Sequence, residues 1–170
     1  MKDAVPREHK AQAPVSVGCF VLTMSDTKTP ETDTSGALIR ELLTAAGHRI
    51  TGHAIVKDDP AQVTAVIRSG CAAPSVEAFI LTGGTGITSR DSTFEAIEAL
   101  LDKRLTGFGE LFRMLSYQEI GAAAMLSRAQ GGVVQGRVLF SLPGSPNACR
   151  LALEKLIIPE LPHLIREVRR

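Results

Sequence analysis

The stretch AFILTGGTGITSRD, residues 78–91, decides the fold that the sequence predicts. Its first five residues form a short apolar run of the kind found in a buried strand. The run passes directly into Gly-Gly-Thr-Gly at residues 83–86, and a helix is expected to open at Ser92. A strand, a glycine-rich turn and a helix in this order are typical of an α/β domain that binds an anion at the turn.

Glycine tolerates positive φ and lets a ligand approach the backbone, so successive N–H groups in residues 83–86 can face a phosphate. The spacing matches neither the G-x-G-x-x-G dinucleotide pattern nor the G-x-x-x-x-G-K-[ST] pattern. An ordinary tight turn between strand and helix is the alternative. The polar residues that follow, Thr-Ser-Arg-Asp at 88–91, favour the phosphate-binding interpretation.

Strands and helices alternate on both sides of this stretch. The expected strands are residues 15–24, 49–56, 78–82 and a late pair at 133–134 and 138–142, and the expected helices are residues 34–46, 60 onward, 92 onward, 108–115, 122–127 and 146–158. This order predicts an α/β fold: a single doubly wound, mostly parallel sheet with helices on both faces, plus a short late β-hairpin. Residues 15–165 are expected to form the domain, with a flexible N-terminal tail at 1–14 and a C-terminal tail at 166–170.

Composition excludes several classes of partner. The chain has 170 residues, a formal net charge of +1 and 4% aromatic residues, which argues against a nucleic-acid or membrane-surface protein. No apolar run is long enough to span a bilayer, and the three cysteines are far apart with no C-x-x-C pair. We therefore expect a cytoplasmic protein with idle thiols. Because 44% of the residues are hydrophobic, part of the surface is expected to lie in an oligomer.

Polar turns follow several of the expected strands. They are Ser25-Asp26, Lys57-Asp58-Asp59, the glycine-rich turn and Pro143-Gly144-Ser145. In open α/β sheets, ligands bind beyond the carboxyl ends of the strands, where the strand order reverses. The sequence therefore predicts one site that these turns share.

Two aspartates in this set allow two interpretations each. Asp58 and Asp91 could cap helices, or they could hold Mg²⁺ beside a phosphate, because Mg²⁺ prefers one or two carboxylates together with phosphate oxygens. Asp59 is better placed as the cap of the following helix. Glu110 and Arg113, three residues apart on an expected helix, could simply pair with each other.

Three motifs carry a resemblance to a known family: LTGGTGITSRD at 81–91, GFGE at 107–110 and LPGSP at 142–146. Together they resemble the MogA/MoaB family of molybdenum cofactor biosynthesis. The segments FRMLS at 112–116 and EIG at 119–121 make the chain most similar to the MoaB branch. The resemblance spans residues 15–165.

The resemblance implies a molybdopterin-binding fold that assembles as a trimer or hexamer. It also implies an activity, the Mg²⁺-dependent transfer of AMP from ATP to the terminal phosphate of molybdopterin with release of pyrophosphate. Asp58 and Asp91 correspond to the essential acidic pair and to the expected Mg²⁺ ligands. The resemblance assigns substrate binding to Ser25, Asp26, Gly83, Gly84, Thr85, Gly86, Glu110, Ser116, Ser127, Gly144 and Ser145. Other molybdenum cofactor enzymes are the expected protein partners.

One departure bears on phosphate binding. Some family members carry a lysine near Asn147, which this chain lacks, and Arg90 or Arg128 are the candidates to replace it. The chain has no nucleophile constellation, and the reaction needs none because the substrate phosphate attacks. The alternative function is a non-catalytic paralogue that binds molybdopterin as a carrier or scaffold.

Overall fold

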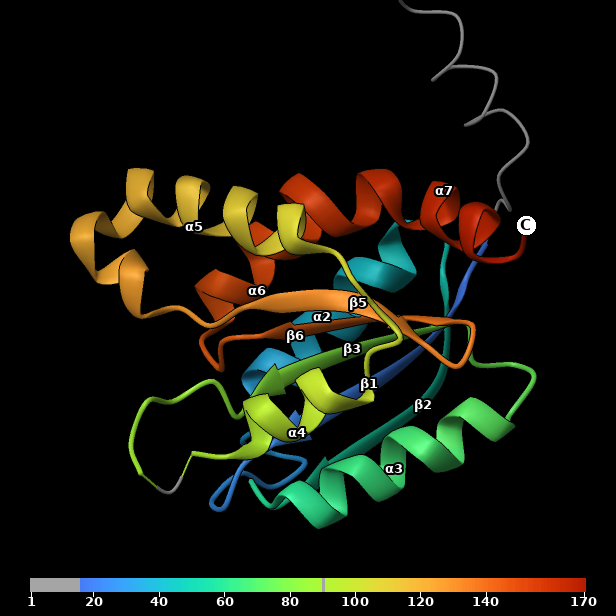
Figure 1. Ribbon diagram of the computed structural model, residues 1–170, viewed down its shortest axis with the longest axis horizontal. Helices are drawn as coiled ribbons and strands as arrows, with labels where there is room; N and C mark the ends of the chain where they lie inside the picture. The colour runs from blue at the N-terminus through green and yellow to red at the C-terminus, as the bar shows by residue number, and fades with distance from the viewer. Residues whose placement is uncertain (1–15, 90) are drawn as a thin grey trace, which may run out of the picture.

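The computed structural model describes residues 16–89 and 91–170, so the predicted tail at 1–14 lies outside the described residues. Six strands form one sheet in the order β2-β1-β3-β6-β5-β4 (Figure 1). The strands are β1 Gly18–Met24, β2 Arg49–Val56, β3 Ala78–Gly83, β4 Lys103–Arg104, β5 Gln130–Val134 and β6 Arg137–Leu142. The first four in the spatial order are parallel, whereas β5 and β4 are antiparallel to their neighbours.

Helices cover both faces of the sheet, which confirms the predicted doubly wound fold (Figure 1). The elements are α2 Thr34–Ala45, α3 Pro60–Ala72, α4 Thr93–Leu100, α5 Thr106–Ile120, the 3-10 turn η1 Gly121–Leu126, α6 Pro146–Ala152, the π-helical segment η2 Leu153–Ile157 and α7 Ile158–Val168. Helices α3 and α4 lie on one face, and α2, α5, α6 and α7 lie on the other. Each face buries its own hydrophobic cluster against the sheet.

Side-chain caps mark the start of three helices, and the first is Asp33, which accepts the Gly36 N–H at 3.0 Å at the start of α2. The Asp59 carboxylate accepts the Gln62 N–H at 2.9 Å and Pro60 occupies the first turn of α3, as predicted. Ser145 caps α6 in the same way, accepting the Ala148 N–H at 3.2 Å. Ser92 and Glu95 have the sequence spacing of a capping box, which predicts a side-chain cap at the start of α4. The prediction is wrong, because Ser92 is the N-cap but makes no side-chain cap bond.

The late hairpin is confirmed and its turn explains its register. β5 and β6 pair as antiparallel strands up to Val134 and Arg137. The two residues between them, Gln135 and Gly136, have φ values of 46° and 73°. Two consecutive positive φ values are typical of the tight turns that suit the twist of a hairpin.

Sequence patterns do not predict strand β4, and they end the last helical region too early. Strand β4 was not predicted, because two exposed residues, Lys103 and Arg104, are too few to form a pattern. Helix α6, the segment η2 and helix α7 follow one another to Val168, beyond the predicted helix end near residue 158. The following Arg169 forms an ion pair with Glu77, which ties the end of the chain to the sheet.

The strand order reverses at β1. Its neighbours are β2 on one side and β3 on the other, reached through α2 and α3 on opposite faces. Strands β1, β2, β3 and β6 have their carboxyl ends at the same end of the sheet, which we call the carboxyl edge. The opposite end of the sheet is called the amino edge. The loops after β1 and β3 diverge at the carboxyl edge, which is where doubly wound sheets bind ligands. Within residues 16–89 and 91–170, no helix combines the length and apolar character needed to cross a bilayer.

Candidate functional site

The glycine-rich loop, residues 83–86, leaves β3 in a conformation that requires glycine. Gly83 and Gly84 have φ values of 99° and 63°. A Cβ atom at Gly83 would lie 2.2 Å from the carbonyl oxygen of Met24 on the neighbouring strand. Backbone torsion and close packing therefore both exclude a side chain at the point where the loop begins.

Asp58 lies beside this loop and carries an unsatisfied oxygen. Its backbone N–H donates to Asp26 Oδ1 at 3.3 Å, which joins the turns after β1 and β2. Its own Oδ1 is buried and has no hydrogen-bond partner among the described residues. A Cβ atom at Gly84 would lie 3.1 Å from that oxygen. A buried polar atom without a partner calls for an explanation, and a bound cation or ligand donor would supply one.

Asp91 closes the other end of the loop. Its Oδ2 accepts the Thr88 N–H at 2.7 Å, and a Cβ atom at Gly86 would lie 2.2 Å from the same oxygen. The carboxylate therefore packs directly against the loop backbone, whereas the N-cap of α4 is Ser92.

Two hydroxyl groups hold the turn at residues 143–145 beside the glycine-rich loop. The Thr82 hydroxyl donates to the Pro143 carbonyl at 3.1 Å, and the Ser35 hydroxyl donates to the Gly144 carbonyl at 2.7 Å. A Cβ atom at Gly144 would lie 3.6 Å from Gly83 Cα, an ordinary contact distance. The ends of β3 and β6 thus present their turns side by side.

The turn after β1 is held by its own serine. The Ser25 hydroxyl accepts the N–H groups of Thr27 and Lys28, both at 3.2 Å. Its backbone N–H donates to the Val56 carbonyl at 2.9 Å, which brings the end of β1 against the end of β2. Ser25 and Asp26 therefore reach the carboxyl edge as predicted, with Asp26 in contact with Asp58.

A cleft of about 350 Å³ opens beside the loop, between it, α5, η1 and the turn at residues 143–145. We call it the loop cleft. Its lining combines apolar side chains with hydroxyls, and it includes Thr85, Gly86, Phe112, Ser116, Ser127 and Ser145. Three serines that the sequence assigned to substrate binding thus lie around one cavity that adjoins the glycine-rich loop.

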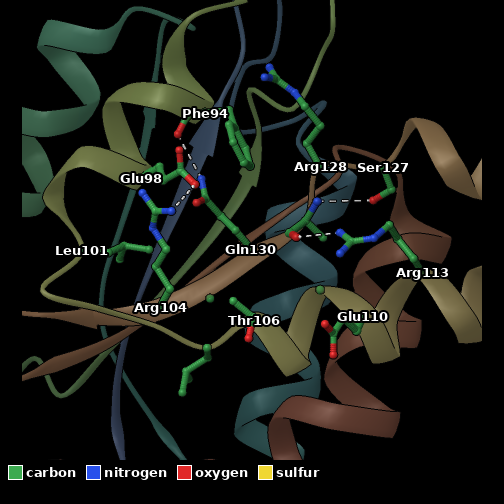
Figure 2. Close-up of a pocket in the computed structure, with 14 residues that line it drawn as sticks. Phe94, Glu98, Leu101, Arg104, Thr106, Glu110, Arg113, Ser127, Arg128 and Gln130 are labelled. Carbon is green, nitrogen blue, oxygen red and sulfur yellow. Dashed lines mark hydrogen bonds and ion pairs between the residues drawn. The ribbon is translucent and has the colours of Figure 1, made fainter.

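Glu110 does not share that cleft. It lines a second cavity of about 390 Å³, shown in Figure 2. We call this cavity the arginine cavity, because Arg104, Arg113 and Arg128 are among the residues that line it. Ser127 lines both cavities and marks the wall between them. The alternative pairing of Glu110 with Arg113 is not seen in the described part of the chain, where Arg113 Nη1 instead donates to the Ala129 carbonyl at 3.4 Å.

Arg128 was a candidate phosphate cation, but its position in the fold could not be predicted from sequence patterns. It follows η1, yet its guanidinium reaches residues 85–95, more than thirty positions earlier in the chain. Its Nε donates to the Thr85 carbonyl at 3.3 Å, and its Nη2 donates to the carbonyls of Gly86 and, at 3.4 Å, Asp91. Arg90, the other predicted phosphate cation, lies outside the described residues.

The remaining contacts of Arg128 are with helix α4. Its Nη1 pairs with Glu95, and its guanidinium carbon lies 4.5 Å from the centre of the Phe94 ring. A hydrogen bond from the Glu95 backbone N–H, followed by the one from Arg128, lowers the pKa of the Glu95 carboxyl. The ion pair therefore persists through the neutral pH range.

The cysteines provide no nucleophile. All three are free and buried, as predicted. Burial raises the pKa of the Cys19 thiol to about 12 and that of the Cys149 thiol to about 11. Both groups are therefore protonated, unreactive thiols at neutral pH.

The described ranges 16–89 and 91–170 hold no cluster of three or more His, Cys, Asp or Glu side chains that could bind a metal ion by itself. Mg²⁺ that arrives with a phosphate needs only one or two carboxylates, because phosphate oxygens and water complete its coordination. The unpartnered Oδ1 of Asp58, beside a glycine-rich loop, fits such an ion.

Comparison with known proteins agrees with this geometry. Residues 20–163 match the family described as "probable molybdopterin binding domain". The chain is 54% identical over 164 residues to molybdenum cofactor biosynthesis protein B of Bacillus cereus, covering 96% of this chain and 97% of that protein.

Solved structures extend the similarity to the fold. A crystal structure of molybdenum cofactor biosynthesis protein B is 54% identical and superposes with a TM-score of 0.90, covering 94% of this chain and 99% of the other. The tungsten cofactor synthesizing protein MoaB from Pyrococcus furiosus is 39% identical with a TM-score of 0.83, covering 93% and 100%. The chain therefore belongs to this molybdopterin-binding-domain family of molybdenum cofactor biosynthesis proteins, and within it to the MoaB branch.

Proposed function

We propose that the protein transfers AMP from ATP to the terminal phosphate of molybdopterin in the presence of Mg²⁺ and releases pyrophosphate. The observation that carries the proposal is the arrangement at the carboxyl edge. A glycine-rich loop lies there between a buried, unpartnered carboxylate oxygen on Asp58 and the loop cleft. The relatives' names, which refer to molybdenum and tungsten cofactor synthesis, support the same class of substrate.

The two substrates are assigned to opposite sides of the loop. The loop cleft, with the Phe112 side chain and the hydroxyls of Ser116 and Ser127, suits a flat heterocycle that carries hydrogen-bonding groups. Its terminal phosphate would then face the glycine-rich loop. ATP would lie on the other side, near Asp26 and Asp58. The attacking group is a substrate phosphate, so the protein contributes position and charge neutralisation.

Asp58 is the residue that would hold Mg²⁺, with Asp91 as the second carboxylate at the loop. A bound Mg²⁺ neutralises the charge that builds up on the phosphate oxygens during transfer. Without an ion or a donor from the ligand, the buried Asp58 oxygen is left without the hydrogen bonds that water would supply, which is unfavourable. Because Mg²⁺ also binds phosphate oxygens, we expect the ion and the nucleotide to bind together.

We also propose that the chain forms a homo-oligomer, a trimer or a hexamer. Large apolar side chains are exposed along α5 and η1, and Met125 and Tyr117 are 79% and 63% exposed. The set comprises Leu111, Met114, Tyr117, Ile120, Met125 and Leu126. Exposed large apolar side chains gathered on a helix and on the turn that follows it are typical of an interaction surface. We further propose that the protein acts in the cytoplasm, with ATP and the other molybdenum cofactor enzymes as its partners.

Pyrophosphate release from Mg²⁺-ATP tests the function. Purified protein is incubated with both substrates, with either substrate alone, and with both substrates plus a chelator. Release only when Mg²⁺, ATP and molybdopterin are all present supports the transferase. Absence of release, together with tight molybdopterin binding in the same preparation, would replace it with a carrier that binds molybdopterin without catalysis.

A further inference from the structure

The Arg128 guanidinium donates most of its hydrogen bonds to the backbone of the loop that follows β3. Its donors contact the carbonyls of Thr85, Gly86 and Asp91 and the carboxylate of Glu95. In Figure 2 its side chain extends away from the arginine cavity, whereas Arg104 and Arg113 stay at the cavity wall. Its guanidinium is thus committed to protein groups.

Peptide geometry makes this contact directional. The described peptide bonds are all trans, so each carbonyl and the N–H group that follows it point in opposite directions. With the Thr85 and Gly86 carbonyls turned toward Arg128, the N–H groups of Gly86 and Ile87 point away from it. In the described part of the chain, these two N–H groups donate to no protein acceptor.

Little else in the described residues holds this segment in place. Residues 84–87 belong to no helix or strand. Within the loop, the Asp91 N–H donates to the Thr88 carbonyl at 3.0 Å, and the Asp91 carboxylate accepts the Thr88 N–H. These bonds join Thr88 to Asp91 and do not involve the carbonyls of Thr85 and Gly86, which contact Arg128.

We propose that Arg128 is a positioning residue for anion binding. By taking up the carbonyls of Thr85 and Gly86, it orients the N–H groups of Gly86 and Ile87 toward a phosphate on the opposite side of the loop. The inference deepens the proposed function and rests on it for the identity of the substrate phosphate. It replaces the expectation that Arg128 itself neutralises the phosphate.

The test measures binding of inorganic pyrophosphate to the full-length protein by calorimetry, without turnover. Arg128→Ala is expected to weaken binding about tenfold, the loss expected when hydrogen bonds to a charged group are misdirected. Guanidinium ion at millimolar concentration should restore binding, and sodium chloride at equal ionic strength should not. Arg104→Ala is the matched control, because Arg104 also borders the arginine cavity and, among the residues that the structure describes, its guanidinium pairs with Glu98 and contacts no carbonyl of the loop. It should bind pyrophosphate as the wild type does.

A second variant, Arg128→Lys, separates orientation from charge and guards against misfolding. Lysine keeps the positive charge but cannot donate to three carbonyls at once, so its binding should also weaken. Wild-type affinity in Arg128→Lys would overturn the proposal, as would failure of guanidinium to rescue Arg128→Ala or no binding by the wild type. If wild-type protein binds pyrophosphate in this Arg128-dependent way but releases none from ATP and molybdopterin, the positioning role stands and the adenylyl transfer fails.

Discussion

The carboxylates at the two ends of the sheet differ in how their buried oxygens are paired. At the amino edge, Glu77 is 9% exposed and accepts the Gly18 N–H at 2.5 Å. It also pairs with Arg49 at 3.3 Å and with Arg169, so its carboxylate is fully engaged. At the carboxyl edge, the buried Oδ1 of Asp58 has no partner among the described residues.

The different pairing of Glu77 and Asp58 indicates that Glu77 contributes to stability and Asp58 to function. A buried carboxylate with three donors stabilises the folded chain, because the donors replace the water that the group has lost. An unpartnered one destabilises it, and such a group persists where a ligand completes it. Substitutions at the two edges should therefore divide cleanly into those that change folding and those that change turnover.

The largest expected effect is the loss of activity in Asp58→Asn. Asparagine keeps the shape of the side chain but removes the charge that would hold Mg²⁺. We expect the turnover number to fall by a factor of about 100 to 1,000, the range seen when one group that stabilises transferred charge is removed. The free energy of unfolding should stay equal or rise. Steady-state pyrophosphate release and denaturant unfolding measure the two quantities.

Asp59→Asn is the control for that experiment. The neighbouring carboxylate caps α3, and asparagine caps helices equally well. This variant should keep both turnover and stability near the wild-type values. Equal activity losses in the two variants would mean that the general negative charge of this turn matters, not the Asp58 oxygen.

At the amino edge, Glu77→Gln should show the reverse pattern. Losing the charge weakens the hydrogen bonds from Gly18, Arg49 and Arg169, and the exposure of both arginines limits the cost. We expect a loss of about 2 kcal/mol in the free energy of unfolding. Turnover per folded molecule should be unchanged. A drop in turnover without loss of stability would contradict the division between the edges.

A smaller effect is expected from Gly84→Ala, which adds one methyl group beside Asp58. Positive φ at an alanine costs about 1 kcal/mol of stability. The new Cβ would also lie 3.1 Å from Asp58 Oδ1 and crowd the proposed ion. Turnover should therefore fall in addition to stability.

Gly136→Ala is the control that separates the crowding beside Asp58 from the cost of a positive φ. Gly136 has a φ of 73°, close to the 63° of Gly84, and nothing lies within 4 Å of its Cβ position. Both variants should lose the stability that a positive φ costs at an alanine. Gly84→Ala should lose more in thermal unfolding, because its Cβ would also lie 3.1 to 3.3 Å from Asp58, Thr93 and Met24, and only Gly84→Ala should lose turnover. Equal turnover in both would show that the space beside Asp58 is not needed.

The smallest expected effect concerns pH and Cys149, which lies under the turn at residues 143–145. Burial raises the pKa of its thiol to about 11 from 9.0, so the folded chain keeps a proton that the unfolded chain releases. Stability is therefore complete below pH 9 and falls as the pH rises toward 11. At pH 10 the loss should be about 1 kcal/mol. Unfolding curves of wild type and Cys149→Ala at pH 8 and pH 10 measure it, and an equal decline in both would refute the assignment.

Much of the fold could be predicted from local patterns. Apolar runs located the parallel strands, and Asp59-Pro60 and Ser145-Pro146 located two helix starts. The failures have physical causes. Ser92 and Glu95 match a capping box, but Arg128 takes the glutamate through a tertiary contact. Strand β4 is too short to leave a pattern.

The candidate site was predictable as a set of turns but not as a set of contacts. The rule that ligands bind at the carboxyl ends of strands brought together Asp26, Asp58 and the glycine-rich loop. Glu110 was assigned through resemblance, and the structure places it in a different cavity from Ser116. The role of Arg128 depends on a contact across more than forty residues with Thr85, which no periodicity encodes.

Detection of the product by mass spectrometry tests the central claim most directly. Wild-type protein and Asp58→Asn are incubated with Mg²⁺, ATP and molybdopterin, and the pterin is then recovered. The account predicts that the wild type converts molybdopterin to a species heavier by one AMP group, and that Asp58→Asn returns it unchanged. Recovery of unmodified molybdopterin from wild-type protein that has bound both substrates would contradict the claim that the carboxyl edge catalyses adenylyl transfer.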